Sequence, residues 1–242
     1  STLTIGTHSL LPKEHTMTHV TTQRAIRKTV DLLPVFDTCS ANLANVFNER
    51  QDCHTSGDSY ASYHDLAMSA SAGDIWRGAG TGSAISPLLS IDKNMTYMAK
   101  AFTDGSGADL PILGGSRRKA TLMLETHAGR DMVRGEMLAI IGSGMKTRSF
   151  AKNIAEPFRP GPLTIDRHAI AIEFGRPLDD KEIKLLSRRG AYAYLSAPYR
   201  SEARKHGMMG HDYQAVVWSV WRDLSTDERA DLTVQHPLPV AA

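Results

Sequence analysis

The chain has 242 residues, of which 41% are hydrophobic and 22% are charged, a composition typical of a globular protein. No apolar stretch approaches the roughly 18 to 20 residues that a membrane-spanning helix needs. The first eleven residues contain no basic segment followed by an apolar one, so we expect no secretory signal. These features predict a cytoplasmic protein without a membrane partner.

The cysteine count and the net charge exclude further classes of protein. Cys39 and Cys53 fit a reduced interior better than a disulfide framework, and an all-cysteine iron–sulfur cluster would need four thiolates. A net charge of +2 does not by itself indicate nucleic acid. Between Arg117 and Arg159, however, nine basic residues stand against four acidic ones.

Apolar residues recur at helical spacing along most of the chain, and no segment shows the alternation of a strand. The sequence therefore predicts a mostly α-helical protein. The expected helices are Thr21–Leu33, Ser40–Glu49, Ser59–Ser71, Lys93–Phe102, Arg118–His127, Arg134–Ile141, Thr147–Glu156, Arg167–Phe174, Asp180–Leu186, Pro198–Lys205 and Asp212–Leu224.

Four segments interrupt this helical spacing. Gly73–Gly82 and Thr103–Ser116 are rich in glycine and are expected to be loops. The prolines in Pro157–Pro162 end one helix and enforce a turn before the next. The last segment, Thr226–Ala242, is expected to be a frayed tail.

A tight turn, Gly142-Ser143-Gly144, separates two of the expected helices. Glycines permit a positive φ and a close approach of the backbone to another molecule. The N-terminus of the following helix presents free N–H groups, which bind phosphate oxygens without reading sequence. The candidate DNA-binding residues of this hairpin are Gly142, Ser143, Gly144, Met145, Thr147, Arg148 and Lys152.

Asp166 follows a short apolar run and directly precedes the helix expected at Arg167–Phe174. A carboxylate at this place can serve as a helix cap and nothing more. His168, two residues later, would either orient Asp166, contact a DNA phosphate, or pack in the interior. These alternatives stay open from the residues alone.

Together, the turn and the Asp166 segment resemble the helix-hairpin-helix (HhH-GPD) DNA glycosylase superfamily. Its hairpin reads roughly L-P-G-V-G-x-K-T-A, and a V-D-T-H segment follows about twenty residues later. Ile140–Thr147 and Ile165–His168 occupy these two places, and weaker likeness extends over Ala84–Asp223. Ile141 replaces the usual proline, and the iron–sulfur cysteines are missing. The chain thus resembles endonuclease III-like members without the cluster, and uncharacterised phage-type relatives most of all.

The resemblance implies a two-lobed helical HhH-GPD DNA glycosylase fold, with a DNA-binding cleft between the lobes. Residues 84–225 would form the glycosylase core, with the hairpin at about 134–156 and the catalytic segment at 163–175. Residues 1–83 would form a helical extension that contributes to one lobe, and residues 226–242 would form the tail.

The resemblance also implies an enzyme that flips a damaged or modified base out of double-stranded DNA and cleaves its N-glycosidic bond. Asp166 would stabilise the positive charge that develops near C1′ of the sugar. Lys146 stands where bifunctional members have their amine nucleophile, which forms a Schiff base and then nicks the strand. We expect a bacterial or phage-encoded monomer with no metal, and no cofactor beyond a monovalent cation at the hairpin.

The base pocket is expected to include Trp76, Ser86, Phe150 and Trp218, although aromatic residues at helical spacing are more often core residues. Two alternatives remain, a phage-type base-modifying enzyme on the same scaffold and a non-catalytic hairpin module that only binds DNA. Oxidised purines, alkylated bases and hydroxymethyl-pyrimidine derivatives are all open as substrates. We slightly favour a modified base of viral DNA, excised in phage defence or in phage metabolism.

Overall fold

A computed structural model describes residues 22–23, 25–27, 29–49, 59–126, 129–188 and 190–236. All regular structure in these ranges is helical, so the prediction of a mostly α-helical protein is confirmed. Cys53 and part of the expected helix Thr21–Leu33 lie outside the described residues. The helices are α2 (Phe36–Glu49), α3 (Ser59–Ala70), α4 (Ile75–Ile85), α5 (Ile91–Asp104), α6 (Gly114–Glu125), α7 (Arg134–Ile141), α8 (Met145–Ala155), α9 (Arg167–Phe174), α10 (Asp180–Ile183), α11 (Ala191–Lys205), α12 (Gly210–Asp223) and α13 (Thr226–Leu232), with a 3₁₀ turn, η2 (Lys184–Ser187).

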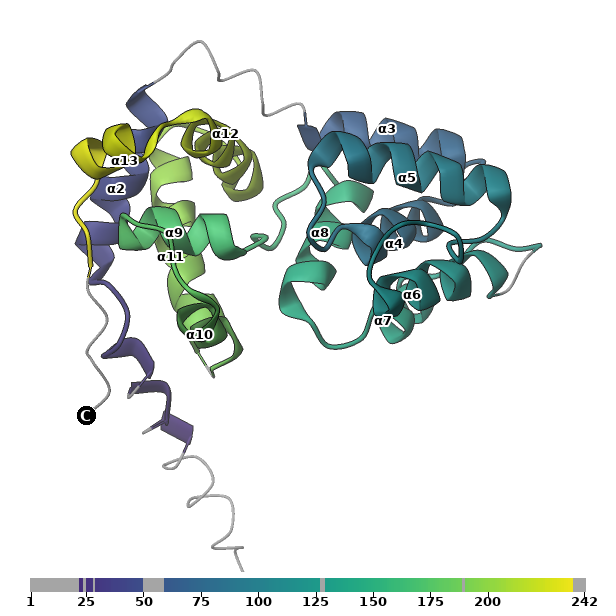
Figure 1. The fold of residues 1–242 in the computed structure, drawn as a ribbon, viewed down its shortest axis with the longest axis horizontal. Coiled ribbons are helices and arrows are strands. Elements are labelled where there is room, and N and C mark those ends of the chain that lie inside the picture. The colour runs from purple at the N-terminus through teal and green to yellow at the C-terminus, as the bar shows by residue number, and fades with distance from the viewer. Residues whose placement is uncertain are drawn as a thin grey trace, which may run out of the picture.

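The helices form two groups that lie side by side (Figure 1). One group contains α3 to α8, and its buried side chains include Ala79, Met98 and Ile154. The other contains α2 and α9 to α13, and it buries Leu43 and Val217 among others. The chain passes from one group to the other between α8 and α9. No helix in the described ranges is both long enough and apolar enough to cross a membrane.

Helix α4 lies at the centre of its group and contacts α3, α5, α6, α7 and α8. Our expectation of a loop at Gly73–Gly82 is wrong, because most of this segment is α4. A Cβ on Gly78 would lie 2.5 Å from a backbone oxygen of α3, and one on Gly80 would lie 2.7 Å from Met137. The glycines allow this close packing, which outweighs their cost of about 1 kcal/mol each in a helix.

The expected C-terminal tail is also partly wrong, because α13 begins there with Ser225 as its N-cap. After α13 the chain packs along the α2 and α9 group. The Thr233 hydroxyl donates to the Gly175 carbonyl at 2.9 Å, and Val234 N donates to Oδ1 of Asn42 at 2.8 Å. These hydrogen bonds fix the segment after α13 to residues far away in the sequence. Its composition alone had predicted a frayed tail.

Residues 1–83 differ from the extension to one lobe that we expected. In the described part of this range, α2 packs against α9, α11 and α12, whereas α3 and α4 belong to the other group. One face of α2 buries Cys39, Leu43 and Val46, which explains its place in the second core. The described residues of this range therefore contribute to both groups.

Helix α11 begins seven residues before the expected start at Pro198. Tyr192, Leu195 and Tyr199 recur at helical spacing and are buried in the core. Proline favours the first turn of a helix, so the sequence predicted that this helix begins at Pro198. Burial of the preceding turns outweighs this preference.

Candidate functional site

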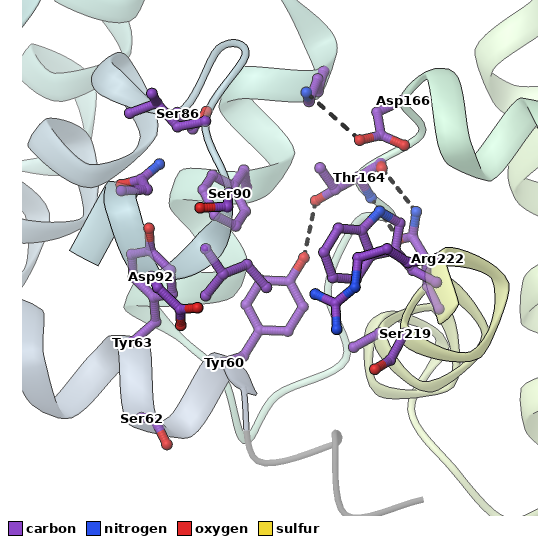
Figure 2. A pocket seen from close by; sticks show the side chains of 18 residues that line it. Tyr60, Ser62, Tyr63, Ser86, Ser90, Asp92, Thr164, Asp166, Ser219 and Arg222 are labelled. Carbon is purple, nitrogen blue, oxygen red and sulfur yellow. Dashed lines mark hydrogen bonds and ion pairs between the residues drawn. The ribbon is translucent and has the colours of Figure 1, made fainter. Parts of the chain in front are cut away.

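A pocket of about 490 Å³ lies between the two groups of helices. Residues of α3, α8 and the α4–α5 turn line one side, and residues of α12 and of the segment before α9 line the other (Figure 2). Its volume falls in the range of sites for small molecules or for one group of a larger ligand. Aromatic, hydroxyl, amide and charged side chains all reach it.

Lys146 and Asp166 face each other at this pocket. The Lys146 Nζ atom lies 3.6 Å from Oδ2 of Asp166, and the two side chains are 44% and 20% exposed. Both residues line the pocket, although Lys146 lies on α8 and Asp166 directly precedes α9. Asp166 is therefore neither buried in an apolar interior nor remote from the glycine turn, and either placement would have contradicted its expected role.

Asp166 also caps α9. Its Oδ1 atom accepts hydrogen bonds from the backbone N–H groups of His168 at 2.9 Å and Ala169 at 3.0 Å. The capping role thus occupies one oxygen and leaves the other directed to Lys146.

The segment before Asp166 is fixed by two side chains. Gln214 on α12 accepts from Thr164 N at 2.9 Å and donates to the Thr164 carbonyl at 2.7 Å. The Tyr192 hydroxyl accepts from Ile165 N at 3.0 Å and donates to the Leu163 carbonyl at 2.6 Å. Burial raises the pKa of Tyr192 to about 12, so this hydroxyl keeps its proton at neutral pH. These bonds tie the position of the carboxylate to α11 and α12.

The glycine turn joins α7 to α8 beside the pocket. Gly142 has φ 82° and ψ −160°, a conformation that essentially only glycine adopts. Gly144 is the N-cap of α8, and no side chain caps the first N–H groups of that helix. Ser143, Gly144 and Met145 are exposed to solvent. An exposed helix N-terminus of this kind is suited to bind an anion.

Two basic side chains hold the other end of this turn. Lys119 Nζ donates to the Ile141 carbonyl at 2.8 Å, and Arg148 Nε donates to the Gly142 carbonyl at 2.5 Å. Both carbonyl oxygens therefore already have cationic partners from the protein itself. Among the described residues, no three His, Cys, Asp or Glu side chains are grouped closely enough to hold a metal ion.

Three of the four side chains expected around a base line this pocket, namely Ser86, Phe150 and Trp218. Trp76 does not, and this expectation is wrong. Because α4 is a helix and not a loop, Trp76 packs against the core of its group. The guanidinium carbon of Arg134 lies 5.9 Å from the centroid of its ring.

Lys152 and Thr147, two more of the expected DNA-binding residues, also have partners within the protein. Lys152 Nζ lies 3.9 Å from a carboxylate oxygen of Glu156 in the last turn of α8. The Thr147 carbonyl accepts a hydrogen bond of 2.6 Å from the hydroxyl of Ser83, which joins α8 to α4. Lys152 is not part of the pocket wall.

His168 packs against the pocket wall. Its ring meets the edge of the Trp218 ring at a centroid distance of 6.0 Å. Burial lowers the pKa of His168, and the negative charge of Asp166 opposes this effect only in part. The imidazole is therefore mainly neutral at pH 7, so it can offer a ligand a hydrogen bond rather than a charge.

Leu88 is a residue at the pocket rim that the sequence did not single out. It lies on the α4–α5 turn, between Ser86 and Leu89, which both line the pocket. Its φ is 66° and its side chain is 75% exposed. A bulky residue rarely adopts this left-handed conformation, and an exposed leucine gains little from burial to offset the strain.

Tyr63 and Asn94 were missed as well. Both line the pocket and both are only 2% exposed. Tyr63 shares helical spacing with Tyr60, a pattern typical of a core face. In the sequence, the one indication that Asn94 belongs to a site was a polar residue on the otherwise apolar face of an expected helix.

Comparison with known proteins identifies a family but no activity. Residues 33–225 match a family of unknown function (DUF7178), and the chain belongs to this family. No curated protein and no solved structure matches the chain. The matched region includes helices α2 to α12, the glycine turn and both walls of the pocket. The fold and the site thus define an α-helical protein with a pocket of mixed polar and apolar lining between two helical groups.

Proposed function

We propose that this protein is a DNA glycosylase, which flips one base out of double-stranded DNA and cleaves its bond to the deoxyribose. A single observation carries the proposal: the Lys146 amine and the Asp166 carboxylate meet at 3.6 Å in a pocket beside an exposed glycine turn. An HhH-GPD architecture, acting as a monomer, is part of the proposal, and the two groups of helices support it.

The turn supports binding of the DNA backbone. The N–H groups at the start of α8 have no side-chain cap, and a phosphate oxygen is their natural partner. Lys146 is the second residue of the same helix. A phosphate bound at the turn would therefore hold the duplex with a nucleotide next to the pocket.

The Asp166 carboxylate supports cleavage of the glycosidic bond. When the C1′–N bond breaks, its electron pair leaves with the base and positive charge develops on the sugar. A carboxylate held near C1′ stabilises this charge. Two backbone N–H bonds fix Asp166 before the substrate arrives, so little reorganisation is needed during the reaction.

Lys146 supports a second chemical step. Its neutral amine would attack C1′ as the base leaves with the bonding electrons and takes up a proton. Opening of the sugar ring then gives a Schiff base, and β-elimination breaks the C3′–O bond and nicks the strand. The ammonium group must first lose a proton, which solvent can accept because the side chain is 44% exposed, and the Asp166 carboxylate stays charged for the sugar.

Leu88 supports the flipping step. Removal of a base from the stack costs a few kcal/mol, and apolar side chains that enter the duplex offset part of this cost. Leu88 presents an apolar side chain to solvent at the rim of the pocket, on a strained turn. We assign it to the space that the extruded base leaves.

Two other activities compete with this proposal. A module that only binds DNA has no use for a fixed carboxylate beside the phosphate site, and a base-modifying enzyme would leave the glycosidic bond intact. The test uses duplexes that each contain one oxidised purine, alkylated base or viral-type hydroxymethyl pyrimidine, followed by mass analysis. Free base with abasic DNA supports a glycosylase. An altered base in an intact strand supports a base-modifying enzyme. Tight binding to unchanged DNA supports a module that only binds DNA.

A further inference from the structure

Two buried polar groups in the pocket wall have no hydrogen-bond partner within the described part of the chain. They are the hydroxyl of Tyr63 on α3 and the Oδ1 atom of Asn94 on α5. Both residues line the pocket, and each is only 2% exposed. A buried polar atom without a partner destabilises the folded protein, so such atoms at a pocket indicate a ligand that pairs with them.

These groups lie away from the proposed reacting end of the pocket. Figure 2 shows Tyr63 and Asp92 on the α3–α5 side and Asp166 on the opposite side. A base whose C1′ lies near Asp166 would therefore extend towards α3 and α5. Burial is the main cause that raises the pKa of Tyr63, so its hydroxyl remains a donor at neutral pH.

We propose that Tyr63 and Asn94 hydrogen-bond the far edge of the extruded base, so that the enzyme selects bases whose hydrogen-bonding edge is intact. This inference rests on the proposed glycosylase function. The Asn94 amide carries a donor beside an acceptor, which matches the adjacent donor and acceptor of a nucleobase edge. The Tyr63 hydroxyl can donate or accept as the base requires.

This assignment narrows the substrate class. A base alkylated on its hydrogen-bonding edge would leave both buried groups unpaired, and sites of this kind reject such ligands strongly. A substituent elsewhere on the ring, such as a 5-hydroxymethyl group or the extra oxygen of an oxidised purine, leaves that edge free. The structure therefore favours 5-substituted pyrimidines and oxidised purines over edge-alkylated bases.

The test uses Tyr63→Phe and Asn94→Leu, which remove the unpaired atoms and keep much of the side-chain shape. Tyr213→Phe is the matched control, because the Tyr213 hydroxyl is also buried and unpaired within the described residues but lies in the other core. Each full-length variant is measured for melting temperature, for affinity to a duplex with a tetrahydrofuran abasic analogue, and for release of the base found with the wild-type protein.

We expect Tyr63→Phe and Asn94→Leu to melt no lower than the wild-type protein and to bind the abasic duplex equally well. Their base release should fall by about ten- to a hundred-fold, whereas Tyr213→Phe should release base normally. Wild-type release by both pocket variants would overturn the inference and leave the proposed function standing. A fall in melting temperature with a parallel fall in release would also overturn it, since that result indicates a structural role. If the wild-type protein releases no base from any duplex, the proposed function fails, and the inference fails with it.

Discussion

Asp166 lies between a helix N-terminus and a lysine amine, with one carboxylate oxygen facing each. Oδ1 accepts the two backbone hydrogen bonds that cap α9, and Oδ2 lies 3.6 Å from Lys146 Nζ. A carboxylate that served only as a cap would not need a cation on its other side. One carboxylate oxygen therefore serves the fold, and the other is available for the proposed chemistry.

Borohydride reduction tests Lys146 as the nucleophile. We expect borohydride to trap the wild-type protein covalently on DNA that contains its substrate base, because reduction fixes a Schiff base. Lys146→Ala should not be trapped, and Lys100→Ala, an exposed lysine outside the pocket wall, should be trapped normally. Because the Lys146 side chain is partly exposed, its loss should change the free energy of unfolding by less than about 1 kcal/mol. Trapping of Lys146→Ala would place the nucleophile elsewhere.

Gly142→Ala tests the turn as a DNA-binding element. At φ 82° and ψ −160° an alanine is strained, so we expect a loss of about 1 to 3 kcal/mol in the free energy of unfolding. Affinity for duplex DNA should fall as the turn changes shape. Gly144→Ala is the control, because φ −59° and ψ 112° are open to any residue. Chemical denaturation and DNA titration measure both effects, and equal losses in the two variants would contradict this account.

Leu88→Gly tests the rim residue through opposite changes in stability and activity. Glycine accepts φ 66° without strain, and little burial is lost, so we expect a gain of about 1 kcal/mol in stability. Base release should fall, since no side chain would fill the space in the duplex. Ala72→Gly is the control, because Ala72 also has a positive φ, of 52°, but lies outside the pocket wall. Ala72→Gly should keep normal base release. Normal release by Leu88→Gly would remove Leu88 from the mechanism.

Glu173 should make stability depend on pH. It is fully buried on α9, and neither carboxyl oxygen has a hydrogen-bond partner in the part of the chain that the structure describes. Burial raises its pKa well above the ordinary 4.5, so the folded state binds this proton more tightly than the unfolded state does. Its contribution to stability is therefore complete below about pH 4.5 and is lost as pH rises towards the folded-state pKa.

Glu173→Gln removes this proton linkage. We expect the variant to be more stable than the wild-type protein at pH 8 and to depend less on pH between about 5 and 8. Glu182→Gln should act in the opposite direction at neutral pH, because Arg176 lowers the pKa of Glu182 by hydrogen bonding. Denaturation at several pH values measures how the free energy of unfolding of each variant changes with pH. A pH dependence in Glu173→Gln equal to that of the wild-type protein would contradict the expectation.

Local sequence patterns predicted the helices around the Lys146–Asp166 pair, although α8 begins two residues before the expected start at Thr147 and so includes Lys146. The bounds of α7 and α9 agree with the expected ranges because Gly142, Asp166 and Gly175 mark their ends by local backbone chemistry. The helical state of α4 was not predictable in this way, because its glycines favour a loop until other helices pack on them. The roles of Tyr63 and Asn94 were also hidden, since only the folded chain brings α3 and α5 to one pocket.

Release of free base by the wild-type protein and by Asp166→Asn is the most direct test of the central claim. Asparagine is as good an N-cap as aspartate, so this variant should keep its fold and bind duplex DNA normally. We predict that its base release falls by at least about a hundred-fold, because the carboxylate that stabilises the sugar cation is gone. Undiminished base release by Asp166→Asn would contradict the account.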